Sequence, residues 1–220
     1  MLLKEVVRRV AHKSSGLQGV SLQGIQMNGP RPARWYDGQA TWEGDFNCSN
    51  QGIKSLESHL VEVTGCFRCS GNKLTSLRWA PKIVGESFVA DEMRTLVEFD
   101  CRVDRIGEPG LDNRFLSIEE SGITSFHDVH RCFKEINGGI FINDTPIKEC
   151  VLGLLLIGSL TAVHDAKEAD GLLGAIYIVN EYLKGSKSRS ATKYDGGSRG
   201  RVVHCQNELL DAGLEEYAKL

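Results

Sequence analysis

The clearest pattern in the chain is a pair of matching segments, GDFNCSNQGIKSL (44–56) and GCFRCSGNKLTSL (65–77), which lie 21 residues apart. In each segment, buried-type residues alternate with polar ones: in the second copy Phe67 and Cys69 flank Arg68. Successive side chains of a β-strand point to opposite faces, so this alternation predicts a short strand whose Phe and Cys point inward.

The second copy also fits the leucine-rich-repeat skeleton L-x-L-x-x-N-x-L, with Asn72 in the asparagine position. The pairs of residues that begin each copy are Phe46/Cys48, Phe67/Cys69, Phe99/Cys101, Leu116/Ile118 and Ile140/Ile142, and a degenerate copy begins at Phe88/Ala90. The asparagine position is occupied in turn by Gln51, Asn72, Asp104, Ser121 and Thr145. We expect these polar side chains to satisfy backbone groups where the chain turns.

The spacing of the copies predicts a stack of coils that is regular only at its start. The interval is 21 residues up to Phe88 and then becomes 11, 17 and 24 residues. One coil cannot bury its own apolar face, so the coils must stack on one another. We therefore predict an α/β repeat fold, an irregular leucine-rich-repeat-like β-solenoid, over residues 44–164.

Helical patterns flank the predicted solenoid. Apolar residues at helical spacing in residues 2–11 predict a helical cap, and residues 1–43 would form this cap and the first coil. LGLLLIGSLTAVHD (152–165) predicts one more buried coil. The region 165–220 predicts a helical hairpin, with a first helix through Leu172, Leu173, Ile176, Val179 and Leu183, and a last helix with Val203, Leu210, Leu214 and Tyr217 on one face.

The repeat segments FNCSNQGIKSL and FRCSGNKLTSL, the latter followed by WAPKIVG, resemble the short leucine-rich-like repeats of bacteriophage accessory proteins. Those repeats read much like F-x-C-S-x-N-x-L-T-S-L. The final HCQNELLDAGLEEYAKL is similar to the helix that follows the repeats in that family. The resemblance covers residues 40–150 and about the last twenty residues, and the chain departs from the pattern after residue 85. It implies a phage protein that acts in an infected bacterium, where comparable small proteins often bind and block a host protein, including host defence systems.

Composition narrows the class of protein. The 220 residues are 41% hydrophobic and 25% charged with a net charge of −3, which is typical of a globular domain and gives no overall attraction for nucleic acid. The seven cysteines cannot all pair internally. The charged N-terminal segment lacks a signal-peptide core, and no apolar run is long enough for a membrane span. We expect a protein of the bacterial cytoplasm with reduced thiols.

Two groups of residues resemble metal sites. Cys66 and Cys69 have C-x-x-C spacing, but on a strand they would lie on opposite faces and could not bind one ion. His127 and His130 could lie on one face of a helical turn beside Cys132, but neighbouring residues supply no complete ligand set. We predict buried structural cysteines, a surface helix with solvated histidines, no metal and no cofactor.

The outward positions of the predicted strands are the candidate partner-binding surface. They are Asn47, Arg68, Val89, Asp100, Ser117 and Phe141, with Cys66 and Phe115 just before their inward residues. Arginine and aromatic residues are typical anchors of protein interfaces. Alternatively, Phe115 and Phe141 pack beneath flanking segments.

A basic, glycine- and serine-rich stretch over 184–201 predicts a flexible loop and offers a second candidate site. Its basic residues are Lys184, Lys187, Arg189, Lys193, Arg199 and Arg201. They could contact a phosphate backbone while Tyr194 stacks on a base.

The sequence contains no common nucleophile, phosphate-binding or zinc-protease motif. We therefore predict a non-enzymatic protein-interaction module. By resemblance it is a phage-encoded inhibitor of a host defence protein, with nucleic-acid binding through the basic loop as the alternative. Self-association through an incompletely capped end or the hairpin is left open.

Overall fold

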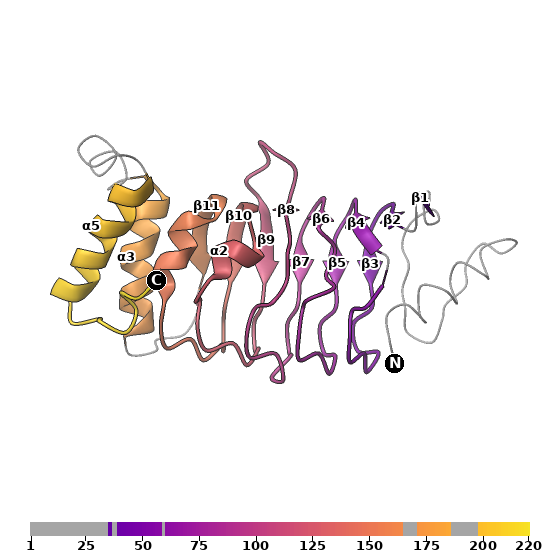
Figure 1. Ribbon diagram of the computed structural model, residues 1–220, viewed down its shortest axis with the longest axis horizontal. Coiled ribbons are helices and arrows are strands. Elements are labelled where there is room, and N and C mark those ends of the chain that lie inside the picture. Colours follow the sequence, from indigo (N-terminus) through magenta and orange to yellow (C-terminus); the bar gives the residue numbers. More distant parts are fainter. Residues whose placement is uncertain (1–34, 37–38, 59, 165–170, 186–197) are drawn as a thin grey trace, which may run out of the picture.

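The protein forms a parallel β-solenoid of about five turns over residues 41–164, followed by C-terminal helices (Figure 1). The description rests on a computed structural model and covers residues 35–36, 39–58, 60–164, 171–185 and 198–220. The predicted N-terminal helix lies outside the described residues.

Each coil contributes a strand to two sides of the solenoid. One side, whose outer surface we call the strand face, contains β3 (Phe46–Asn47), β5 (Phe67–Arg68), β7 (Phe88–Val89), β9 (Arg114–Ser117), β10 (Glu135–Phe141) and β11 (Gly158–His164). The other contains β1 (Trp35–Tyr36), β2 (Gln39–Trp42), β4 (Leu60–Val63), β6 (Ile83–Val84) and β8 (Arg105–Ile106). All these strands pair in parallel except β1 with β2, and β10 joins the two sides where Ile136 pairs with Ile106.

The pairing register confirms the repeat and corrects its spacing. Phe46 pairs with Phe67 and Phe67 with Phe88, so the degenerate copy at Phe88 is a true coil. Phe88 then pairs with Leu116, and Leu116 with Ile140.

The predicted strand at Phe99 is wrong. Residues 99–101 belong to another side of the same long coil, and Phe99 packs in the core at 5.4 Å from Phe133 and 6.2 Å from Phe126, between ring centroids. The 11 residues after Phe88 are too few to complete a coil, since each regular coil takes 21. The third coil is longer because residues 107–113 form a loop that projects beyond the strands (Figure 1).

The coils turn at a repeated left-handed residue. Asn50, Gly71, Glu92, Glu120 and Asp144 follow the strand-face strands of successive coils with φ between 52° and 64°. The amide of each of the first four donates to a carbonyl of the next coil, at 2.8–3.0 Å. Residues other than glycine are strained in this conformation, so these bonds between coils hold the backbone at Asn50, Glu92 and Glu120.

The residue in the asparagine position performs the predicted role in the second coil. Asn72 Oδ1 accepts hydrogen bonds from the amides of Gln51 (3.1 Å) and Ile53 (2.9 Å). Its Nδ2 donates to the carbonyls of Cys48 (2.9 Å) and Cys69 (2.7 Å). The hydroxyl of Thr145 likewise donates to the carbonyl of Ile118 in the preceding coil, at 2.8 Å.

Inward residues form continuous columns that hold the coils together. Phe46, Phe67 and Phe88 are fully buried, and neighbouring ring centroids lie 5.8 and 5.1 Å apart. Cys48 and Cys69 are completely buried beside them. Burying a phenylalanine side chain stabilises a fold by about 3 kcal/mol at most, so the column is a major part of the core.

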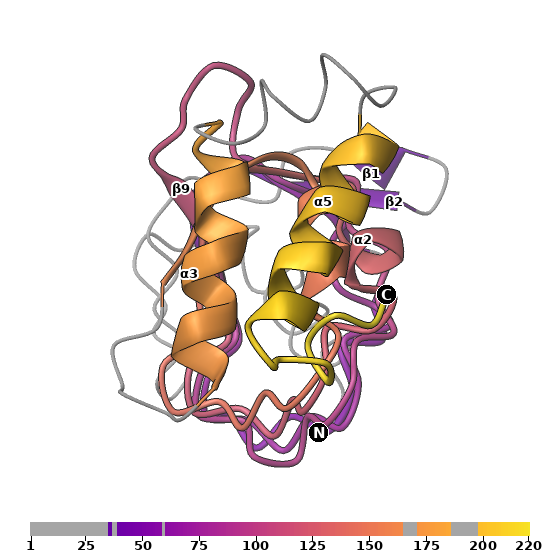
Figure 2. The same cartoon turned by 90° about the vertical axis from the view of Figure 1, so that its left-hand side faces the viewer.

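Helices close the C-terminal end of the solenoid (Figure 2). After the short α2 (Val129–Cys132) and the 3₁₀-helix η1 (Val151–Leu156), α3 (Leu172–Leu183) and α5 (Ser198–Asp211) pack side by side over the last coil. The predicted additional coil is present, because β11 pairs with β10.

The predicted apolar face of the last helix is wrong. Val203 and Leu210 are exposed, whereas Cys205 and Leu209, four residues apart, are fully buried. The expected stripe assumed that the helix continues to Tyr217, but α5 ends at Asp211 and the chain turns at Gly213.

Candidate functional site

The strand face places most of the predicted partner-binding residues in one row. The pairings Asn47–Arg68, Arg68–Val89, Val89–Ser117 and Ser117–Phe141 follow one another across the sheet, and Phe141–His164 extends the row to β11. Cys66 and Phe115 are the residues immediately before the inward side chains Phe67 and Leu116.

Two of the predicted residues, Asp100 and Ser117, are not available to a partner on the strand face. Asp100 lies away from the strand face, where its carboxylate accepts hydrogen bonds from the Leu77 amide (2.9 Å) and the Ser76 hydroxyl (2.5 Å). Ser117 points outward but is buried, and its hydroxyl donates to Asp91 at 2.6 Å. Ser117 therefore offers little surface to a partner.

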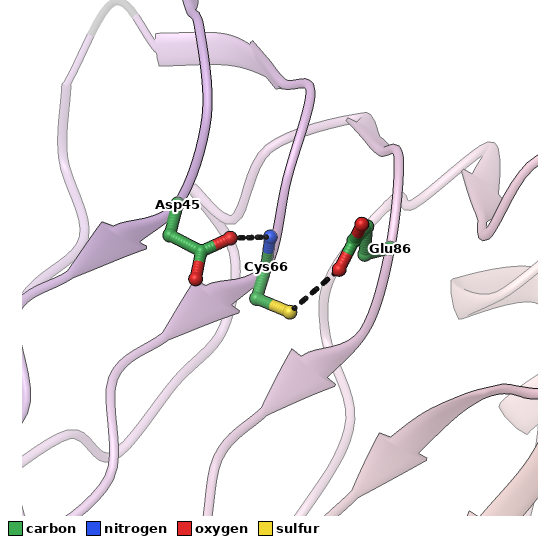
Figure 3. Close-up of side chains that lie close together, drawn as sticks. All are labelled: Asp45, Cys66 and Glu86. Carbon is green, nitrogen blue, oxygen red and sulfur yellow. Dashed lines mark hydrogen bonds between the residues drawn. The ribbon is translucent and has the colours of Figure 1, made fainter. Parts of the chain in front are cut away.

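The N-terminal half of the strand face carries a charged cluster formed by Asp45, Cys66, Arg68, Glu86 and Arg114. Asp45 accepts hydrogen bonds from the backbone amide of Cys66 (2.9 Å) and from the Arg68 guanidinium (3.0 Å). The Cys66 thiol donates to Glu86 at 3.4 Å (Figure 3), and Glu86 also pairs with Arg114 at 3.5 Å. The cluster thus joins the first three coils and β9.

Ligand-type atoms of Asp45, Cys66 and Glu86 lie within 4.8 Å of one another, a spacing that a divalent cation could use (Figure 3). However, both carboxylates already pair with an arginine. Burial raises the pKa of the Cys66 thiol. Burial opposes ionisation of Asp45, but its bonds to the Cys66 amide and to Arg68 outweigh this and lower its pKa. A cation would have to displace two guanidinium groups, so we interpret the cluster as a charge-balanced link between coils.

The C-terminal half of the strand face is aromatic. The ring centroids of Phe115 and Phe141 lie 5.2 Å apart in an edge-to-face arrangement. The imidazole of His164 stacks on Phe141 at 4.6 Å with an interplanar angle of 18°. Phe115 and Phe141 are half-buried and His164 is exposed, so the row presents aromatic surface to solvent.

This aromatic row borders a groove between the last two strands and α3, with a volume of about 520 Å³. Its lining residues are Phe141, Asn143, Val163, His164, Leu173, Ile176, Tyr177 and Asn180. Leu173 and Tyr177 on α3 are 41% and 66% exposed. The Asn180 amide fixes the wall of the groove, because it donates to the Val163 carbonyl and accepts from the Val163 amide, both at 2.8 Å. We use the name aromatic groove for this groove together with the adjoining row of Phe115, Phe141 and His164.

The other sequence-predicted sites are not brought together. His127 is exposed and lies two residues before α2, while Cys132 is buried at the end of that helix. Within the basic stretch, 186–197 lies outside the described residues, and 198–201 begins α5. Arg201 turns inward, and its guanidinium donates to the carbonyl of Leu155.

Sequence reasoning missed Asp45, Glu86, His164, Leu173 and Tyr177. Asp45 precedes Phe46 as Cys66 precedes Phe67, so aligning the first two coils would have identified it. Aligning 158–164 as a sixth strand would have placed His164 beside Phe141. Leu173 and Tyr177 carry no such signal, because the packing of α3 decides which side of it meets the groove.

The chain matches no protein-family model, and comparisons with curated proteins and with solved structures found no significant match. Among the described residues, no helix has both the length and the apolar character required to cross a bilayer.

Proposed function

We propose that this protein is a non-enzymatic interaction module that binds another protein through its strand face, with the aromatic groove as the main contact. One observation carries the proposal: Phe115, Phe141 and His164 form a stacked outward row beside a groove lined by exposed Leu173 and Tyr177. Aromatic side chains contribute large contact areas at protein interfaces with little loss of conformational freedom.

The chemistry of the groove favours an apolar or aromatic side chain of the partner. Phe141, Leu173 and Ile176 supply apolar walls, and the polar groups of Asn143 and His164 lie beside them. Arg68, 39% exposed at the other end of the face, can meet an acidic group of the same partner. The resemblance of the repeats to phage accessory proteins supports a host protein as the partner, and inhibition of a host defence protein in the bacterial cytoplasm as the role.

The test is a pull-down from bacterial lysate with the tagged protein, with and without nuclease, at low and high salt, read by mass spectrometry. Tyr177→Ala and Phe141→Glu are the test variants. Trp79→Glu is the matched control, since Trp79 is an exposed aromatic residue on no strand of the strand face. Circular dichroism and thermal unfolding verify that each variant is folded.

We expect one protein retained at high salt by the wild type and by Trp79→Glu, and lost from both groove variants. Equal retention by folded Tyr177→Ala and Phe141→Glu would reject the aromatic groove. Retention at low salt alone, abolished by nuclease, would reject the proposal in favour of nucleic-acid binding.

A further inference from the structure

Cys101 and Cys132 meet across the third and fourth coils, on a side of the solenoid that the proposed function does not use. Cys101 precedes β8, and Cys132 ends α2. The two segments are joined by a parallel bridge between Val103 and Phe133. The Val103 amide donates to the Cys132 carbonyl at 2.7 Å, and the Cys101 sulfur lies 3.9 Å from the same oxygen.

The geometry is suitable for a disulfide. Cys101 is two residues before Val103 and Cys132 is one before Phe133, so the cysteines are offset by one residue on paired segments. The Cys101 sulfur lies 3.9 Å from the Cys132 carbonyl oxygen, so the two residues are direct neighbours across the coils, as a disulfide requires.

The two thiols are chemically different. The Cys101 thiol donates to the Cys132 carbonyl at 3.9 Å, and its interaction with the Cys132 side chain raises the pKa of Cys101, as does its burial. The interaction with the Cys101 side chain lowers the pKa of Cys132. Cys132 is therefore the thiol that ionises first and is the better nucleophile, and Cys101 is placed to react with it afterwards.

Other cysteines lack this combination. Cys48 and Cys69 are neighbours in the core, but both are fully buried, and burial raises the pKa of Cys48 to about 12. Cys66 is held as a neutral donor to Glu86.

We infer that Cys101 and Cys132 form a redox-active dithiol, which a small neutral peroxide converts to a disulfide that joins the third and fourth coils. The Cys132 thiolate attacks one peroxide oxygen, breaks the O–O bond and becomes a sulfenic acid, while the other oxygen leaves as hydroxide and takes up a proton. The Cys101 sulfur then attacks the sulfenic sulfur and releases water. Two thiols lose two electrons and two protons, and one hydrogen peroxide becomes two water molecules.

The surroundings select the oxidant. Cys132 is the more exposed of the two, at 7% against 2% for Cys101, which favours a small oxidant over a bulky one. The charges of Asp100 and Asp128 lie near enough to raise the pKa of Cys132, opposing the effect of Cys101. Their negative charge repels an anionic oxidant such as glutathione disulfide and leaves a neutral peroxide unaffected.

The disulfide would close a loop from Cys101 to Cys132 that contains the projecting residues 107–113 and β9. Such a link limits the freedom of the unfolded chain, so oxidation raises the unfolding temperature and the change reverses with dithiothreitol. It would also hold Phe115 of the strand face in a cross-linked segment.

The test treats the native wild-type protein with hydrogen peroxide, removes the oxidant, alkylates in denaturant and identifies peptides by mass spectrometry. We expect two of the seven cysteines to become protected from alkylation, in a cross-linked peptide that joins Cys101 to Cys132 and disappears after dithiothreitol. Cys101→Ser leaves Cys132 with no resolving thiol, so a sulfenic-acid probe such as dimedone labels Cys132 in that variant. Cys66→Ser is the control and forms the same cross-link as the wild type.

Recovery of all seven alkylated cysteines from the oxidised native wild type would overturn the inference, as would a cross-link between other cysteines. Both outcomes are measured on the unaltered chain, so they do not depend on whether a cysteine variant folds.

Discussion

Replacing Asn72 with alanine tests how the coils are held together. Asn72 is 5% exposed and makes four hydrogen bonds of 3.1 Å or less to backbone groups, three of them on Cys48, Gln51 and Ile53 of the preceding coil. Alanine removes all four bonds and leaves buried amide and carbonyl groups without a partner. An unsatisfied buried group costs about 1–3 kcal/mol, so we expect a loss of about 4 kcal/mol in the free energy of unfolding.

The loss should be measured by urea denaturation followed by circular dichroism. With a urea slope of about 3 kcal/mol/M for a chain of this size, the midpoint falls by about 1.3 M. Because solenoid coils contact mainly their neighbours, the damage should be concentrated in the first coil. Hydrogen exchange should accelerate at residues 46–56 before it changes in β9 or β10.

Lys73→Ala is the control, because Lys73 is the exposed neighbour of Asn72 on the same turn. We expect it to change the free energy of unfolding by less than about 0.5 kcal/mol. If Asn72→Ala were no more destabilised than Lys73→Ala, the asparagine position would not hold the coils together and the energetic argument would fail.

Three further substitutions test separate features of the fold. Asp91→Asn should stabilise the protein at neutral pH, because burial and then the nearby charge of Glu119 raise the pKa of Asp91. The gain in unfolding free energy, measured by urea titration, should disappear as the pH falls through that pKa and the wild-type Asp91 becomes neutral. A gain that grows in acid would contradict this sign. Glu92→Gly should raise the unfolding free energy by about 0.5 kcal/mol, because glycine relieves the left-handed strain at φ 56°, and a lower unfolding temperature would refute this. Asn180→Ala removes two hydrogen bonds to the backbone of Val163 and should lower the free energy of unfolding by about 2 kcal/mol. Hydrogen exchange at the Val163 amide should become faster, and unchanged exchange there would show that Asn180 does not protect the edge of β11.

The sequence by itself determined the repeating part of the fold. Alternation at Phe46 and Phe67 predicted inward strands, and the polar residue three positions after each cysteine predicted the side chain that bridges the turn. Both signals are local, because the period of a strand and the needs of a turning backbone are expressed within a few residues. The helices after β11 were predictable for the same reason.

Tertiary structure decided which copies share a side of the coil and which residues meet across it. Phe99 has the same local pattern as Phe67, but the third coil is not yet complete at Phe99, so this segment lies elsewhere in the cross-section and forms no strand. Coil closure is a property of the whole turn, and no window of a few residues records it.

The candidate site was only partly visible in the sequence for the same reason. The outward direction of Arg68 and Phe141 follows from alternation, but the stacking of His164 on Phe141 and the exposure of Tyr177 depend on how the last coil and α3 pack. The contact of Cys101 with Cys132 also arises from stacking, because segments distant in sequence become neighbours when a 28-residue coil lies against the next one.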